Sequence, residues 1–386
     1  MSENSRQLIL KFVSETWFGS PAEFFATLPA EEQSRLLQLI MEYKLEALGY
    51  YTLNQALPAS EAAAFQKKYQ ANAVSSLKNK VALKSLYQLF EEKKIRFAPI
   101  KGADLAWRCY PSAALRSFCD WDILIHPDDC LRALEELANA GWKVLDKLNV
   151  NTPHHHFAVH EKDGFFLEPH RSFSQINGVA ASELWQEIKP VQGDSMQHEL
   201  SAELNIIQLV RHFSENNYLH QPQMKFLNDA AALISKSEIN WHKVRKLAEK
   251  WQLPYPGDVL CVWNGFFPES VVEQIAPDAE KLAGYRKVFE MQSAVKGTAP
   301  GEWAMVRSKE SKLTFARKSL KHMTPAAMSE KYNLSNWRFL LLMPGLYIWD
   351  LTVKFFRFCK YIIKPDLNMH RYQQMIDKLE CRHEKK

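Results

Sequence analysis

Apolar residues in the first 90 positions recur at intervals of three and four, a spacing that predicts a succession of amphipathic helices. Pro21 and Pro29 are each followed two positions later by a glutamate, a pattern typical of the first turn of a helix. The stretch from Ser60 to Lys93 predicts the longest of these helices. We assign its apolar residues to the protein core: Phe65, Tyr69, Val74, Leu77, Val81, Leu83, Leu86, Leu89 and Phe90. These helices are expected to support a sheet formed by the residues that follow.

Short extended segments replace the helical pattern after this region. Residues 96–100 predict a strand, which the Lys101-Gly102 pair interrupts. Residues 103–110 have the composition of a helix, and residues 120–125 predict a second strand. The order is therefore strand, glycine turn, helix, loop and strand within about thirty residues.

The second strand carries two acidic residues at alternate positions. Because successive side chains of a strand point to opposite faces, Asp120 and Asp122 are expected on one face, with Trp121 and Ile123 on the other. Two carboxylates about 6–7 Å apart form an oxygen site suited to Mg²⁺, which in proteins is commonly bound together with substrate phosphates. The pattern Asp-x-Asp is common on strand edges, so by itself it does not establish a metal site.

Downstream residues predict more strands and then more helices. A helix over 127–140 is expected to bury Leu131, Leu134, Leu137 and Ala138. Strands are predicted over 142–145, 154–159 and 165–170, and helices over 203–213, 226–234 and 241–251. This arrangement predicts an α+β fold with a small mixed β-sheet between N-terminal and C-terminal helical regions. The expected divisions are residues 1–90, 91–180, 181–300 and 301–386.

Composition narrows the class of protein without specifying a function. The chain has 386 residues, 46% of them hydrophobic, and a net charge of +5, so it is globular and only mildly basic. Its six cysteines form no Cys-x-x-Cys pair, which favours reduced thiols in a cytoplasmic protein. No secretion signal and no specific nucleic-acid-binding module is recognised in the sequence.

The motifs between Lys101 and Asp129 together resemble a known signature. Lys-Gly, Tyr-Pro, Leu-Arg, Asp-x-Asp-Ile-Leu-Ile and Pro-Asp-Asp follow one another as in the polymerase-β-type nucleotidyltransferase superfamily. The chain is most similar to a large, mainly bacterial family of uncharacterised nucleotidyltransferases. In the superfamily a third carboxylate comes from a later strand, and Glu168 in the Glu-x-His pattern with His170 matches it. Many active members of the superfamily have Gly-Ser or Gly-Gly where this chain has Lys-Gly, and Lys-Gly is usual in the uncharacterised family that the chain resembles.

The resemblance implies a role for each matching residue. Asp120, Asp122 and Glu168 would be the catalytic acids that bind Mg²⁺ or Mn²⁺, with Glu168 also a candidate general base. The substrates would be an NTP such as ATP and an unidentified acceptor. The residues assigned to nucleotide or phosphate binding are Lys101, Gly102, Arg116 and His170, and those of second rank are His212 and Asp229. Capping and contacts between helices are the alternative roles of the last two.

Two further segments suggest other ligands. The run His154–His156, with His160 and His170, raises the hypothesis of a zinc site, although no cysteine ligand accompanies it. Residues 335–364 interleave aromatic residues with Lys and Arg, which suits a peripheral membrane surface or a membrane-bound partner. The alternative is a C-terminal helix packed on the protein's own core.

The sequence does not decide between an enzyme, a binding or scaffold protein, and a toxin-like enzyme. The leading hypothesis is transfer of a nucleoside monophosphate from an NTP to an acceptor hydroxyl or phosphate, with cell-envelope or glycan metabolism as one setting. The alternatives are a catalytically silent nucleotide-binding or scaffold protein of a membrane-associated assembly, and a toxin-like nucleotidyltransferase acting on tRNA or protein.

Overall fold

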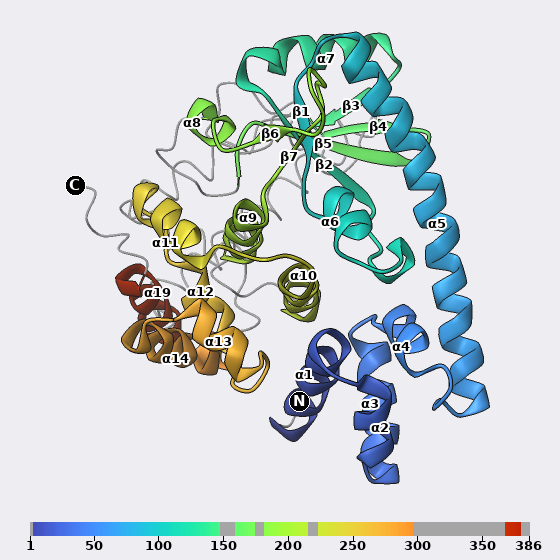
Figure 1. The fold of residues 1–386 in the computed structure, drawn as a ribbon, viewed down its shortest axis with the longest axis vertical. Coiled ribbons are helices and arrows are strands. Elements are labelled where there is room, and N and C mark those ends of the chain that lie inside the picture. Colours follow the sequence, from blue (N-terminus) through green and yellow to red (C-terminus); the bar gives the residue numbers. More distant parts are fainter. Residues whose placement is uncertain (1–2, 147–158, 174–180, 215–222, 296–366, 380–386) are drawn as a thin grey trace, which may run out of the picture. The chain divides into compact units, whose positions relative to one another are not determined.

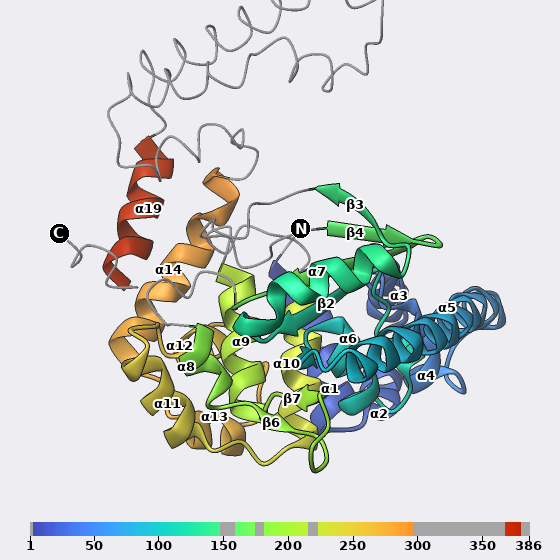
Figure 2. The same cartoon turned by 90° about the horizontal axis from the view of Figure 1, so that it is seen from above.

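The computed structural model describes residues 3–146, 159–173, 181–214, 223–295 and 367–379 (Figures 1 and 2). The chain forms two compact units, Met1–Ala283 and Gly284–Lys386. The histidine run 154–156 and the segment 335–364 lie outside the described residues, so the zinc and membrane hypotheses stay predictions. The four-part division of the chain also stays a prediction.

Five helices form the N-terminal part of the first unit, as the apolar spacing predicted. They are α1 (Glu3–Phe18), α2 (Pro21–Thr27), α3 (Ala30–Glu42), α4 (Glu46–Leu53) and α5 (Ala59–Glu92). Pro21 is the first residue of α2, and Pro29 directly precedes α3, where the missing N–H of proline costs no hydrogen bond. The long helix α5 packs on α4 at its beginning and runs along the sheet at its end (Figure 1).

The prediction for the middle of α5 was wrong. Val74, Leu77 and Val81 are 58–63% exposed and do not contribute to the core. The face of α5 that turns inward at this level carries Ser76 and Asn79 instead. Ser76 donates to the carbonyl of Ala113, and Asn79 accepts from the indole of Trp121, whose buried N–H needs a partner. Polar partners from distant parts of the chain therefore decide which face is buried.

A five-stranded mixed sheet confirms the predicted α+β class. Its strands are β1 (Phe97–Pro99), β2 (Asp120–Ile125), β3 (Lys143–Asp146), β4 (Val159–Lys162) and β5 (Phe165–His170), in the order β1-β2-β5-β4-β3. β2 and β5 are parallel, and the other neighbouring pairs are antiparallel. Between them lie α6 (Gly102–Arg108), two 3₁₀ turns, η1 (Ala113–Leu115) and η2 (Pro127–Asp129), and α7 (Cys130–Asn139).

One face of this sheet packs into a large hydrophobic cluster of the first unit. Trp121, Ile123 and Leu167 point into it and meet the apolar sides of α5 and α7. The alternation along β2 therefore buries the hydrophobic residues and turns the aspartates to the opposite face, as predicted. The buried residues of α7 are Cys130, Ala133 and Leu137, whereas Leu131 is 64% exposed and Ala138 is also exposed, against the prediction. The 3₁₀ turn η2 sets where α7 begins and so which residues face the sheet.

Helices dominate the rest of the described chain. After α8 (Ala181–Trp185) and the small sheet of β6 (Lys189–Pro190) and β7 (His198–Glu199) come α9 (Ala202–Ser214), α10 (Gln223–Lys236), α11 (Trp241–Lys250), α12 (Pro256–Leu260), α13 (Glu269–Ile275), α14 (Ala279–Val295) and α19 (Leu367–Leu379). The three predicted helices between 203 and 251 are confirmed as α9, α10 and α11. Within the described ranges, none of the helices has the length and apolar character needed to cross a membrane.

His160 of β4 is expected to make the fold sensitive to acid. It is fully buried beside Leu167, neither ring nitrogen has a hydrogen-bond partner in the described structure, and burial lowers its pKa to about 4. The unfolded chain binds the proton near pH 6.5, so stability falls as the pH drops from about 6.5 to 4, by about 3 kcal/mol. His160→Leu should abolish this loss.

Urea unfolding at pH 7 and pH 4.5 measures the effect. The stability difference between the two pH values should be smaller in His160→Leu than in the wild type, while His242→Leu, at an exposed position of α11, should match the wild type. An unchanged difference in His160→Leu would exclude His160 as the group responsible.

Candidate metal and nucleotide site

Two acidic residues of the predicted set meet on the face of the sheet opposite the core. The parallel register pairs Asp122 of β2 directly with Glu168 of β5. Directly paired residues in a sheet place their side chains on the same face about 5 Å apart. Asp122 is 3% exposed and Glu168 is half-buried. The register therefore brings together carboxylates that lie 46 positions apart in the sequence.

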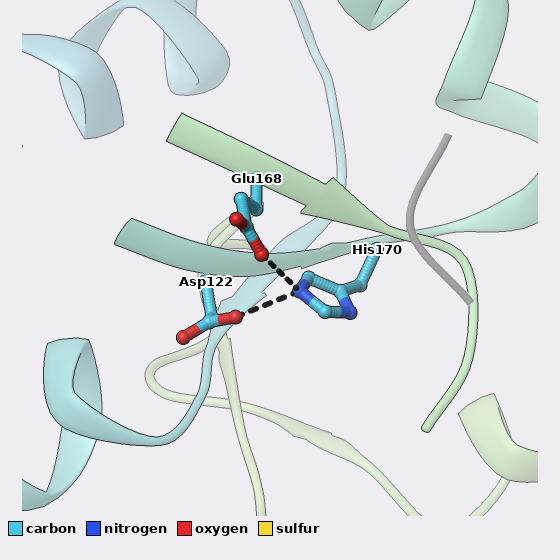
Figure 3. Close-up of side chains that lie close together, drawn as sticks. All are labelled: Asp122, Glu168 and His170. Carbon is cyan, nitrogen blue, oxygen red and sulfur yellow. Dashed lines mark hydrogen bonds and ion pairs between the residues drawn. The ribbon is translucent and has the colours of Figure 1, made fainter. Parts of the chain in front are cut away.

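His170 completes a cluster with these two carboxylates (Figure 3). It pairs with Leu124 in the same register, so its side chain rises from the same face. Its Nε2 atom lies 2.8 Å from Asp122 Oδ1 and 3.9 Å from Glu168 Oε2. Each of the three side chains offers one ligand atom, and these atoms lie within 4.8 Å of one another. Two carboxylates and an imidazole suit a divalent metal ion.

Lys101 contacts the same carboxylate from the turn between β1 and α6. Its Nζ lies 2.8 Å from Asp122 Oδ1, and 13% of its side chain is exposed. Burial alone would raise the pKa of Asp122, but Lys101 and the hydrogen bond from His170 hold it well below its usual range. Asp122 is therefore ionised at neutral pH, as a metal ligand must be.

The backbone of Lys101 adopts a conformation that glycine favours. Its φ of 53° and ψ of −127° lie outside the regions open to most side chains, at a cost of about 1–3 kcal/mol. The next residue is constrained by packing, because a Cβ on Gly102 would lie 2.7 Å from Cβ of Phe118. The Lys-Gly pair thus places a lysine in a backbone conformation that suits glycine, and it leaves no space for a side chain at the next residue.

Asp120 lies on the same face but outside the three-residue cluster. It pairs with Phe166 and is half-buried. Lys225 of α10, which the sequence did not suggest, approaches Asp120 and Arg116. The Lys225 side chain is exposed overall, but partial desolvation of its ammonium group and the charge of Arg116 lower its pKa. Lys225 precedes Asp229 by four residues, so both project from one side of α10, but its proximity to Asp120 depends on how α10 packs.

Arg116 and Asp229 form a buried ion pair. Arg116 Nε and Nη2 donate to the two carboxylate oxygens of Asp229 at 2.6 and 2.8 Å, and Nη1 donates to the carbonyl of Ser117. The two side chains are 8% and 3% exposed. This geometry favours a positioning role for Arg116 and differs from the phosphate-binding role suggested by the sequence. The other second-rank residue, His212, is exposed on α9 and lies outside the cluster.

A chain of hydrogen bonds extends this pair to the N-terminal helices. Tyr110 donates to Asp229 Oδ1 at 2.6 Å, and Asn228 Nδ2 donates to the Tyr110 hydroxyl at 3.1 Å. Trp17 of α1 donates its indole N–H to Asn228 Oδ1 at 2.6 Å. The network ties α1 and α10 to the loop that leads into β2, four residues before Asp120.

Comparison with known proteins places the chain in a family. The profile of a family described as "Uncharacterised nucleotidyltransferase" matches residues 29–256, more than half of the chain. The chain belongs to this family. A search of curated proteins gives no significant match. The matched region of this nucleotidyltransferase family member contains the cluster of Asp122, Glu168 and His170, as well as Lys101 and the Arg116–Asp229 pair.

Proposed function

We propose that this protein is a metal-dependent nucleotidyltransferase whose metal ligands are Asp122, Glu168 and His170. The convergence of these three side chains on one face of a nucleotidyltransferase sheet is the observation that carries the proposal. A divalent ion bound there would neutralise charge on the triphosphate and on the departing pyrophosphate. Asp120, on the same face, would add negative charge beside this centre.

The reaction forms one bond and breaks one. An acceptor oxygen attacks the α-phosphorus of an NTP, and the bond from that phosphorus to the bridging oxygen of the β-phosphate breaks. The nucleoside monophosphate is then joined to the acceptor, and pyrophosphate leaves with the bond's electron pair. For a hydroxyl acceptor, Glu168 is the candidate to take the proton, because it is the most exposed of the three cluster side chains. Lys101 is the cation placed to contact phosphate oxygens.

Transfer of label from each of four α-³²P-labelled NTPs tests the proposal. The wild-type protein is incubated with Mg²⁺ or Mn²⁺ and fractionated cell extract as the source of acceptors. Label entering a product shows transfer, and the separation of RNA, protein and glycan fractions identifies the acceptor class. Absence of transfer with all four NTPs and both metals would favour the alternative of a nucleotide-binding scaffold.

The imidazole of His170 is expected to make the site prefer Mn²⁺ to Mg²⁺. Mg²⁺ strongly favours oxygen ligands, whereas Mn²⁺ more readily accepts a mixed set of carboxylate and imidazole. Replacing His170 with Gln should weaken Mn²⁺ binding at least about tenfold and affect Mg²⁺ less. Calorimetric titration of both ions measures this without turnover.

His242→Gln is the matched control for this change, because His242 is exposed on α11 and distant in sequence from the cluster. Its affinity for both ions should equal that of the wild type. Equal losses of Mn²⁺ and Mg²⁺ affinity in His170→Gln would argue that His170 orients Asp122 and does not itself select the metal.

A further inference from the structure

The ammonium group of Lys101 contacts an oxygen atom that is a ligand in the proposed metal site. Asp122 Oδ1 is 2.8 Å from Lys101 Nζ and 2.8 Å from His170 Nε2. Both side chains of the lysine–aspartate pair are largely buried, so their interaction is only weakly screened by solvent. A divalent ion at the same carboxylate would lie close to the ammonium. Two cations at such a distance repel each other strongly outside bulk water.

The turn that carries Lys101 is fixed on both sides. The N–H of Ile100 donates to the carbonyl of Asp122 at 3.0 Å, and the carbonyl of Lys101 accepts from Leu105 at 2.8 Å. Gly102 packs directly on Phe118. The backbone of Lys101 therefore stays beside β2 in its unfavourable conformation, and only the flexible side chain is able to move. Strain retained at such a position is typical of functional sites.

From these observations we propose that Lys101 is a displaceable internal cation of the metal site. Lys101 neutralises Asp122 in the protein without metal, and its ammonium group would move from the carboxylate to an oxygen of the triphosphate when a metal–triphosphate complex is bound. The site consequently resists metal alone and favours metal that arrives with a triphosphate. This inference rests on the metal site of the proposed function. It adds that Lys101 regulates when a metal ion binds there.

The proposal predicts opposite effects of one substitution on two affinities. In Lys101→Met the competing charge is absent, so Mn²⁺ alone should bind at least about tenfold more tightly. The same substitution removes a cation that contacts the triphosphate, so the complex of Mn²⁺ with inorganic tripolyphosphate should bind at least about tenfold more weakly. General damage to the site would weaken both. Tripolyphosphate serves as the probe because it requires no knowledge of the base.

A second substitution separates the effect of losing the charge from the effect of the backbone conformation. Lys101→Gly removes the ammonium as Lys101→Met does, but it also suits the backbone conformation. The two variants should show the same binding changes, and the melting temperature of Lys101→Gly should be a few degrees higher. Lys94 provides matched controls because it is an exposed lysine that also has a positive φ, 54°. Lys94→Met and Lys94→Gly should leave both affinities unchanged.

Electron paramagnetic resonance of free Mn²⁺, with calorimetry for the tripolyphosphate complex, measures the two affinities. A tighter Mn²⁺ affinity together with a weaker complex affinity in both Lys101 variants supports the inference. Unchanged or weaker binding of Mn²⁺ alone overturns it, and label transfer by the wild type would then leave the proposed function standing. Failure of every protein to bind Mn²⁺ in either form would overturn the inference together with the metal site.

Discussion

Replacing Asp122 with Asn is expected to lower nucleotidyl transfer by a factor on the order of 10³ while the protein remains folded. Asn has nearly the same shape, and its carbonyl oxygen is able to accept from Lys101 and His170, which both contact Asp122 in the wild type. It lacks the negative charge that a metal ligand supplies. The loss should therefore appear in the rate and in metal affinity, with circular dichroism unchanged.

Asp163→Asn is the matched control for this substitution. Asp163 lies exposed at the turn between β4 and β5 with a φ of 55°, a conformation that Asn also tolerates. The same chemical change there should leave transfer within twofold of the wild type, roughly the scatter expected for an exposed site. Retention of most of the activity by Asp122→Asn would remove Asp122 from the catalytic site.

Replacing Asp229 with Ala is expected to cost about 3–5 kcal/mol of the free energy of unfolding. The substitution leaves the buried guanidinium of Arg116 without its carboxylate and removes the acceptor of the Tyr110 hydroxyl. A buried charge without its partner is strongly destabilising because it is held away from water. Urea unfolding followed by far-UV circular dichroism measures the change.

Two comparisons show whether loss of the buried ion pair causes the destabilisation of Asp229→Ala. Asp128→Ala removes a carboxylate whose side chain is 75% exposed, and it should cost less than about 1 kcal/mol. The double variant Arg116→Met/Asp229→Leu removes both charges and should recover most of the stability lost in Asp229→Ala. A loss below about 1 kcal/mol in Asp229→Ala would mean that the pair contributes little to the fold.

Local patterns in the sequence predicted much of the sheet that carries the candidate site. The alternation in residues 120–125 correctly divided β2 between a hydrophobic face with Trp121 and an acidic face with Asp122, because a strand has a period of two. The Glu-x-His pattern correctly placed Glu168 and His170 on one face of β5. The resemblance identified the family, and the profile match confirms it.

Contacts between distant segments could not be predicted from these patterns. The parallel register of β2 and β5 groups His170 with Asp122 and Glu168 and leaves Asp120 outside, although the sequence placed Asp120 among the metal ligands. The register follows from the packing of the whole sheet. Likewise the partner of Arg116 lies 113 positions away on α10. An arginine beside a predicted phosphate site gives no indication that a distant aspartate already binds its guanidinium.

The exposed apolar stripe on α5 shows that local spacing is also insufficient to predict which face of a helix is buried. Apolar spacing predicts that Val74, Leu77 and Val81 share a face, but not that this face is buried. The inward face is instead selected by the hydrogen bonds that Ser76 and Asn79 make to Ala113 and Trp121. Buried polar groups must be paired, and this requirement outweighs the burial of a few methyl groups.

The most direct test of the central claim compares ATP labelled at the α-phosphorus with ATP labelled at the γ-phosphorus, or the corresponding pair of whichever NTP the protein uses. Nucleotidyl transfer should move the α label to the acceptor and release the γ label as pyrophosphate in equal amount, and both signals should fall together by a factor on the order of 10³ in Asp122→Asn. Appearance of the γ label on the acceptor, with the α label left in a nucleoside diphosphate, would show phosphoryl transfer and contradict the account.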